Sequence, residues 1–275
     1  MDDLVSVSWL AANKHAADLV IVDASWHLDP QRNARAEYDA RHIPGARFFD
    51  IKALGSLDAA KPFTLPSPEA FGAAMEQLGI GSDDRIIIYD DSAIRTSARA
   101  WFLLRHFGAQ QVAILDGGLG CWMTEGQPVT DAPPVPRPAR FAASVARPDG
   151  VVNKEELLRG TGMTVADARP AERFAGTTPE PRPGIEPGHI PGSRNLPMSS
   201  LYDSDGRFRP LAELRAAFAS AGIDPERPFI ASCGSGVTAN SLIFAARLLG
   251  NRDTRLYNGS WTEWGADPLT PKERG

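Results

Sequence analysis

Cysteine is scarce in this sequence, which contains only Cys121 and Cys233 among its 275 residues. Two cysteines are too few for a disulfide framework, and they offer no cysteine–histidine spacing typical of a zinc site. Neither residue is therefore expected to serve in a cross-link or a metal centre. Each is either a reactive thiol or a buried, inert one.

Long apolar runs and an excess of positive charge are missing as well. The longest apolar runs, such as residues 19–22 and 86–89, are far shorter than the roughly 20 residues of a membrane-spanning helix. The formal net charge is −5, and no run of lysine and arginine could neutralise a phosphate backbone. The acidic start Met1-Asp2-Asp3 lacks the basic segment of a targeting peptide. We predict a soluble, cytoplasmic protein with neither a membrane nor a nucleic acid as partner.

The length and composition fit a chain of two globular domains. With 275 residues it is about twice as long as one domain of roughly 100–200 residues. Hydrophobic residues make up 43% and charged residues 23%, close to globular averages, so each domain can bury an ordinary core. On length alone, one large α/β domain stays an alternative.

The two halves of the chain repeat one another. The turn His42-Ile43-Pro44-Gly45-Ala46-Arg47 recurs as His189-Ile190-Pro191-Gly192-Ser193-Arg194, and a short β-rich segment ending in an aspartate precedes each copy. Each half continues with a strand, a loop, a helix, a further strand and a glycine turn. The strand, the helix, the further strand and the glycine turn are residues 85–89, 97–104, 112–115 and 116–118 in the first half. In the second half they are residues 228–232, 238–249, 255–257 and 258–259. The repetition predicts two copies of one α/β unit.

A proline-rich stretch, residues 132–138, separates the two copies. It cannot hold a helix and should run extended as a connector. We predict an N-terminal domain over residues 1–132, a connector over 133–149 and a C-terminal domain over 150–275. Because strands alternate with helices, each domain is expected to be a mainly parallel sheet flanked by helices, with ligands beyond the carboxyl ends of the strands.

Cys233 stands where such a sheet binds ligands. A predicted strand leads directly into Cys233-Gly234-Ser235-Gly236-Val237-Thr238, and a long apolar helix follows. In a tight strand–loop–helix turn, backbone N–H groups and the helix N-terminus converge on one point, where a thiolate is stabilised. The two glycines let the backbone approach a ligand closely, and Ser235 and Thr238 add hydroxyl donors. This pattern predicts a reactive Cys233 rather than a merely buried one.

A cysteine-dependent phosphatase would use a similar loop. Such an enzyme needs an arginine at the end of the loop to hold the phosphate oxygens, and this chain has Ala239 there. Phosphoryl transfer is therefore disfavoured.

With its duplicated unit, its two His-Ile-Pro-Gly turns and the loop 233–238, the chain resembles the tandem rhodanese-type sulfurtransferases over nearly its whole length. The loop resembles that of the 3-mercaptopyruvate branch. The resemblance implies a catalytically inactive N-terminal domain and an active C-terminal one. Counted at the spacing of the two strand–loop–helix segments, Ser92 takes the place of Cys233, so the first half is expected to lack a sulfur nucleophile there.

The loop also indicates which sulfur donor the resemblance implies. Enzymes of the thiosulfate branch carry an arginine and a lysine directly after the cysteine, where this chain has the uncharged Gly234 and Ser235. A less anionic donor, mercaptopyruvate with one carboxylate, is therefore implied. Arg173 and Arg182 match the two arginines that hold the donor's carboxylate and ketone oxygens, a task suited to the paired N–H groups of a guanidinium.

The resemblance implies a two-step transfer that requires no metal or organic cofactor. The Cys233 thiolate attacks the donor's sulfur, which leaves a persulfide on the protein while pyruvate departs as its enolate. A small thiol, a reduced thiol protein such as thioredoxin, or cyanide then takes the outer sulfur. The protein is expected to act as a monomer. The residues expected to bind the substrate and the bound sulfur are Arg173, Arg182, Gly234, Gly236, Val237 and Thr238.

One part of the family pattern is missing. Mercaptopyruvate enzymes of this type commonly follow a Phe-Phe-Asp-Ile run with an acidic residue and later carry His-Met-Leu-Pro; that acid and histidine are proposed to join the loop serine in a proton relay. This chain has Lys52 and Phe63 at those positions. Ser235, the second expected catalytic residue, should therefore donate a hydrogen bond to the developing enolate, while water or the incoming thiol supplies the proton.

Two other functions stay open at this point. A thiosulfate–cyanide sulfurtransferase is disfavoured by the uncharged residues after Cys233, and a non-catalytic binding module is disfavoured by the intact cysteine loop. The remaining notable residues are interpreted as structural: Cys121 as a packed thiol, His42 and His189 as stabilisers of the repeated turn, Asp23 and Asp167 as turn caps or arginine partners, and Trp26, Trp101, Trp122, Trp261 and Trp264 as packing residues.

Overall fold

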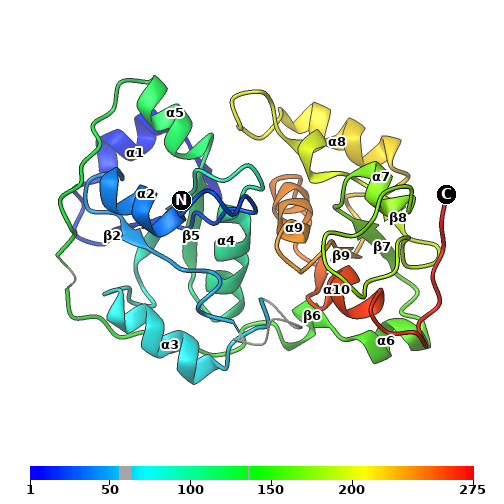
Figure 1. Cartoon of the computed structure of the whole chain (residues 1–275). Coiled ribbons are helices and arrows are strands. Elements are labelled where there is room, and N and C mark those ends of the chain that lie inside the picture. The colour runs from blue at the N-terminus through cyan, green and yellow to red at the C-terminus, as the bar shows by residue number, and fades with distance from the viewer. Residues whose placement is uncertain (56–62, 136) are drawn as a thin grey trace. The chain divides into compact units, whose positions relative to one another are not determined.

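The structure, a computed structural model, describes residues 1–55, 63–135 and 137–275; Pro136 of the predicted connector lies outside the described residues. The chain divides into two compact units, whose elements are labelled in Figure 1. The first unit comprises residues 1–55, 65–146 and 204–208. The second comprises the described residues within 56–64, together with 147–203 and 209–275. No helix of the described residues is long and apolar enough to cross a membrane.

Each unit is built on a five-stranded, entirely parallel sheet. The first sheet contains β1 (Leu4–Val5), β2 (Leu19–Asp23), β3 (Arg47–Phe48), β4 (Arg85–Tyr89) and β5 (Gln111–Leu115) in the order β1-β5-β4-β2-β3. The second contains β6 (Val151–Val152), β7 (Thr164–Asp167), β8 (Arg194–Asn195), β9 (Phe229–Ser232) and β10 (Arg255–Tyr257) in the order β6-β10-β9-β7-β8. The two orders correspond strand by strand, which confirms the predicted duplication of a parallel α/β unit.

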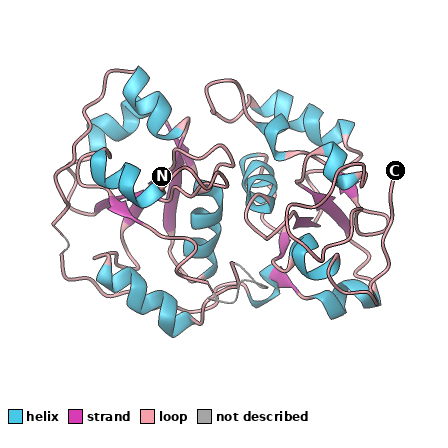
Figure 2. Cartoon of the chain, viewed as in Figure 1, coloured by secondary structure: helices cyan, strands magenta, loops and turns pink. Residues whose placement is uncertain are grey.

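Helices flank both sheets, as Figure 2 shows in cyan against the magenta strands. The first unit contains α1 (Val7–Asn13), α2 (Ala34–Ala40), α3 (Pro68–Gln77), α4 (Ser97–His106) and α5 (Gly118–Thr124). The second contains α6 (Lys154–Arg159), α7 (Ala171–Phe174), α8 (Leu211–Ser220), α9 (Ala239–Leu248), α10 (Ser260–Trp264) and two short 3₁₀ turns at Pro148–Gly150 and Met198–Leu201. Side-chain oxygens of Ser6, Asn33, Ser67 and Asn153 accept hydrogen bonds from backbone N–H groups at the starts of α1, α2, α3 and α6, which explains why these helices begin there.

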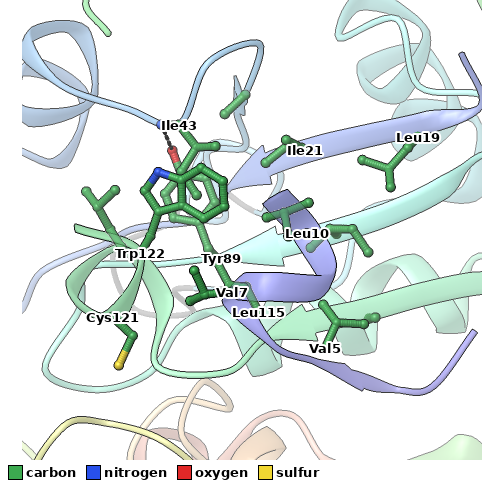
Figure 3. Packing of buried hydrophobic residues seen from close by; sticks show 14 of the residues in the cluster. Val5, Val7, Leu10, Leu19, Ile21, Ile43, Tyr89, Leu115, Cys121 and Trp122 are labelled. Carbon is green, nitrogen blue, oxygen red and sulfur yellow. Dashed lines mark hydrogen bonds between the residues drawn. The ribbon is translucent and has the colours of Figure 1, made fainter. Parts of the chain in front are cut away.

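The inner strands β2, β4, β5 and β9 are largely apolar because both faces of each sheet are covered. Alternate residues of β4 point to opposite faces, and Ile87 and Tyr89 join the core that lies under α1, α2 and α5 (Figure 3). Within this core the Tyr89 hydroxyl accepts a hydrogen bond from the Ile43 N–H at 3.2 Å. Cys121 of α5 is buried in the same cluster, and burial raises the pKa of its thiol. This confirms the prediction that Cys121 is a packed residue.

Each repeated histidine joins its turn to a distant segment of the same unit. The backbone of His42 exchanges two hydrogen bonds with Thr130, and that of His189 exchanges two with Glu273. In each ring, Nδ1 lies 2.8 Å from a backbone oxygen, that of Tyr38 for His42 and that of Phe174 for His189. The predicted turn-stabilising role is confirmed for both.

The aspartates at the ends of β2 and β7 close equivalent turns. Asp23 accepts a hydrogen bond from the Ser25 N–H at 2.9 Å, and Asp167 accepts one from the Arg169 N–H at the same distance. Asp167 also forms an ion pair with the Arg169 guanidinium, whereas Asp23 is buried and has no such pair among the described residues. Burial therefore raises the pKa of Asp23 to about 6.

This shift makes the first unit's stability depend on pH. Folded Asp23 holds its proton to a higher pH than unfolded Asp23, so its contribution to stability falls as the pH rises through the range from about 4 to about 6. Asp23→Asn should remove this loss. We expect the unfolding free energy of the Asp23→Asn variant to match that of the unmodified protein near pH 4. Above pH 6 the variant's value should be higher by up to about 3 kcal/mol. Denaturant titrations of both proteins across this range measure the difference; one that does not vary with pH would refute the explanation.

Candidate active site

Cys233 follows directly after β9 and lies at the bottom of a tight loop. Its residue surface is 1% exposed, and its Sγ accepts a hydrogen bond from the Gly236 N–H at 3.2 Å. Gly236 has φ +77°, and a Cβ there would lie 2.5 Å from the backbone oxygen of Asn258. Only glycine fits this position without strain, so its predicted role in bringing the backbone close to the sulfur has a direct geometric basis.

The rest of the predicted loop surrounds this sulfur. Val237 is buried, and Gly234, Ser235 and Thr238 are partly exposed. Within the described part of the chain, the hydroxyls of Ser235 and Thr238 make no hydrogen bond, so both groups are free to bind a ligand. Thr238 precedes α9 directly and, in a helical backbone conformation, begins the turn that carries the chain into that helix.

The short helix α10 holds the cysteine by its backbone. The Cys233 N–H donates to the Ser260 Oγ at 3.1 Å, and the Cys233 carbonyl accepts from the Trp261 N–H at 2.9 Å. The carbonyl of Gly234 accepts from both the N–H and the Oγ1 of Thr262, at 2.9 and 2.6 Å. Sequence reasoning assigned no role in the site to this helix. The only sequence signal for it was the Asn258-Gly259 turn that ends the repeat.

Arg173 packs against the loop from one side. A Cβ on Gly234 would lie 3.2 Å from the Arg173 Nη2, so the guanidinium rests directly on the glycine. Its position is fixed by Glu180, whose carboxylate accepts from Nη2 at 2.5 Å and from Nε at 3.3 Å. The Glu180 side chain is only 3% exposed, so the pair lies largely out of water.

Glu180 in turn belongs to a buried chain of alternating charges. Its other contact is Arg169, at 3.0 Å, and Arg169 pairs with Asp167 at 2.7 Å. The Arg169 guanidinium also lies 4.6 Å from the ring centre of Trp261 in α10. Buried charges of this kind are stable only when each is paired and hydrogen-bonded. Sequence reasoning named Asp167 and an arginine partner but missed Glu180.

Arg182 reaches the same glycine from another side. Its Nη1 donates to the Thr262 Oγ1 at 2.9 Å, and that hydroxyl donates to the Gly234 carbonyl. Burial, and next the positive charge of Arg173, lower the pKa of Arg182. The two predicted arginines thus meet beside the residue that follows Cys233, where they can bind an anionic or carbonyl group next to the sulfur.

The first unit contains an equivalent loop, and the structure corrects which residue corresponds to Cys233. The Asp90 carbonyl accepts from the Leu119 N–H in the way that the Cys233 carbonyl accepts from the Trp261 N–H. The preceding residues correspond as well, because the carbonyls of Tyr89 and Ser232 both accept from the residue after the strand-end aspartate. The counterpart of Cys233 is therefore Asp90 and not Ser92. The strands before the two loops end 143 residues apart, and the helices after them begin 142 residues apart because the first loop, 90–96, is one residue longer than 233–238. A constant spacing of 141 residues, taken from the expected helix starts 97 and 238, therefore placed Ser92 two residues past the counterpart.

A carboxylate occupies the first loop in place of a thiol. The Asp90 side chain accepts hydrogen bonds from the N–H groups of Ser92 and Ser97, at 2.8 and 2.9 Å, and burial raises its pKa. Among the described residues, no group of three or more histidine, cysteine, aspartate or glutamate side chains could hold a metal ion. At the equivalent position the second loop presents the thiol of Cys233.

Comparisons with known proteins agree with this geometry. The family model of the rhodanese-like domain matches residues 6–125 and 153–267. The 3-mercaptopyruvate sulfurtransferase of Escherichia coli K12 is 39% identical over 98% of this chain and 97% of its own, and the thiosulfate sulfurtransferase of Rattus norvegicus is 38% identical over 95% and 91%. The crystal structure of SseA from Escherichia coli superposes with a TM-score of 0.85 at 36% identity, covering 95% of this chain and 99% of that one. The chain therefore belongs to the rhodanese family, of which it carries two domain copies in tandem.

Proposed function

We propose that this protein is a 3-mercaptopyruvate sulfurtransferase that carries sulfur as a persulfide on Cys233. One observation carries the proposal: a buried thiol lies in a loop whose next two residues are uncharged, while Arg173 and Arg182 converge on the first of them. The arginines supply positive charge for one carboxylate. The loop itself supplies none for a second anionic group.

In the first half-reaction the donor's carboxylate and ketone oxygens bind Arg173 and Arg182. The Cys233 thiolate attacks the donor's sulfur, a new S–S bond forms, and the carbon–sulfur bond breaks with its electron pair moving to carbon. The product is the enolate of pyruvate, to which the Ser235 hydroxyl can donate a hydrogen bond. Water or the incoming thiol supplies the proton that completes pyruvate.

In the second half-reaction a nucleophile attacks the outer sulfur of the persulfide. The S–S bond breaks, the acceptor keeps the outer sulfur, and Cys233 leaves as a thiolate ready for the next donor. Backbone N–H groups of Gly234, Gly236, Val237 and Thr238 are suited to hold the bound sulfur meanwhile. A small thiol, a thiol protein such as thioredoxin, or cyanide can act as acceptor.

In this proposal the first domain, over residues 1–132, takes no part in the chemical steps. Its loop presents the Asp90 carboxylate, which cannot form a persulfide, and that carboxylate already uses the N–H groups of Ser92 and Ser97. Residues 133–149 connect it to the catalytic domain, 150–275. The cytoplasmic location and the monomeric state expected from the sequence stay predictions.

A thiosulfate–cyanide sulfurtransferase is the second candidate, because a relative named thiosulfate sulfurtransferase is as similar as one named 3-mercaptopyruvate sulfurtransferase, at 38% identity each. Overall sequence identity therefore does not distinguish the two possible donors, so the choice between them depends on the residues of the loop. Gly234 and Ser235 bring no charge to a doubly anionic donor. Rates measured side by side with mercaptopyruvate and thiosulfate test the choice, and a higher kcat/KM with thiosulfate would reverse it.

The sulfur-carrying role of Cys233 is tested by its replacement. Cys233→Ser should abolish turnover, because serine neither ionises at neutral pH nor carries the sulfur. Cys121→Ser, the control for a buried cysteine outside the site, should stay active. Mass spectrometry after incubation with mercaptopyruvate should show one added sulfur atom on the unmodified protein and on the control, and none on Cys233→Ser. A sulfur atom gained by Cys233→Ser would transfer the role to another residue.

The arginines are tested by charge-preserving changes. A lysine keeps the positive charge but loses the paired N–H groups, so Arg173→Lys and Arg182→Lys should each lower kcat/KM for mercaptopyruvate by roughly 1.5–3 kcal/mol. The fold should survive, as circular dichroism can verify. Unchanged kcat/KM in both variants would mean that the donor binds elsewhere.

Ser235 is expected to contribute as a hydrogen-bond donor without a relay. Phe63, at the position where the family carries histidine, is buried, and its carbonyl accepts from the Asn258 Nδ2 at 3.1 Å. Ser235→Ala should therefore cost only about 1–2 kcal/mol in kcat/KM, the scale of one lost donor. The pH profile of kcat/KM should contain no histidine titration near about 6.5. A loss above roughly a thousandfold, equal to about 4 kcal/mol, would reveal a relay through another residue.

A further inference from the structure

Ser260, the first residue of α10, has a backbone conformation that favours glycine. Its φ is +51°, it is fully buried, and its counterpart in the first unit is Gly118 with φ +58°. A side chain in the left-handed region is uncommon and costs of order 1 kcal/mol or more unless its surroundings hold it there. Glycine would fit this backbone without that cost, so the contacts of the serine hydroxyl call for an explanation.

Those contacts converge on the reactive cysteine. The Ser260 Oγ accepts a hydrogen bond from the Cys233 N–H at 3.1 Å and donates one to the Tyr257 carbonyl at 2.9 Å. The same oxygen lies 3.9 Å from the Cys233 Sγ, within reach of a hydrogen bond to sulfur. A hydroxyl has one proton and can rotate it between two acceptors. The Tyr257 carbonyl and the Cys233 sulfur therefore compete for the Ser260 proton.

We propose that Ser260 is a further catalytic residue, which donates its hydroxyl proton in a hydrogen bond to Sγ whenever that sulfur is an anion. The proposal rests on the proposed function, in which Sγ alternates between a thiolate and the inner sulfur of a persulfide. In the persulfide the negative charge is available only on the outer sulfur. The hydroxyl then returns to the Tyr257 carbonyl.

This exchange assists the release of sulfur. When an acceptor thiolate attacks the protonated outer sulfur, the S–S bond breaks and its electron pair moves to Sγ, while the acceptor becomes the persulfide. The Ser260 hydroxyl turns towards the developing charge on Sγ, and a thiolate that is better stabilised leaves faster. The Gly236 N–H, in the loop, already donates a hydrogen bond to Sγ. The Ser260 hydroxyl, in α10, supplies a second donor to the same sulfur.

Two variants separate this chemical role from a structural one. Ser260→Gly removes the hydroxyl and relieves the left-handed backbone, so it should fold well. Ser260→Ala removes the hydroxyl and keeps the backbone cost. Ser193→Ala is the matched control, because Ser193 is also a buried serine of the second unit whose hydroxyl donates to a backbone carbonyl, that of Ile190 at 2.6 Å.

The first measurement is the ultraviolet absorbance of the Cys233 thiolate as a function of pH, with the Cys233→Ser protein subtracted. In both Ser260 variants the midpoint of thiolate formation should lie about one to two pH units higher than in the unmodified protein. The second is the single-turnover transfer of sulfur from the loaded protein to cyanide, which should slow roughly ten- to a hundredfold. Ser193→Ala should change neither.

An unchanged midpoint in folded Ser260→Gly would overturn the proposal, because a structural role alone would not move it. The absorbance titration needs no sulfur donor. If the unmodified protein takes no sulfur from mercaptopyruvate while the midpoint still shifts in the variants, the proposed donor is wrong and the contact between Ser260 and Sγ stands.

Discussion

In the proposed function the Cys233 sulfur must carry negative charge while buried from water, and the contacts around its loop depend on this requirement. An ion in a protein interior costs several kcal/mol unless nearby donors and charges compensate for the lost hydration. Cys233 receives this compensation from the Gly236 N–H and from the arginines beside Gly234. Each of these groups needs support of its own. The buried Glu180 fixes Arg173, Thr262 connects Arg182 to the loop, and α10 holds the cysteine by both of its backbone groups.

The sequence was sufficient to predict the parts of this arrangement that are local. The strand, the Cys233 loop and the helix after it are contiguous, and the repeat located the same elements twice. Ser260 and Thr262 were beyond reach, because their roles arise from contacts with the loop 27 and 28 residues earlier in the sequence. Glu180 was missed although its partners Arg169 and Arg173 lie only 11 and 7 residues away. Nothing in the pattern around Glu180 distinguishes a buried carboxylate between two arginines from an exposed one in a loop.

The comparison of the two loops shows how small errors in spacing mislead sequence reasoning. Counting at constant spacing placed Ser92 opposite Cys233, whereas the hydrogen bonds place Asp90 there. Both loops follow the central strand of their sheet, β4 or β9, and offer backbone N–H groups to the first side chain after it. In the first unit that side chain is a carboxylate and is satisfied within the loop. In the second unit that side chain is the thiol of Cys233, which carries the sulfur in the proposed function.

The contact between Arg173 and Gly234 has a consequence for how donor preference can change during evolution. Any side chain at position 234 starts 3.2 Å from a guanidinium that a buried carboxylate holds in place. An arginine at position 234 would therefore meet this guanidinium both sterically and as a like charge, so we expect the substitution to require an adjustment of Arg173. Positions 173, 180 and 234 are linked by direct contact, and we expect a substitution at one of them to alter the effect of a substitution at another.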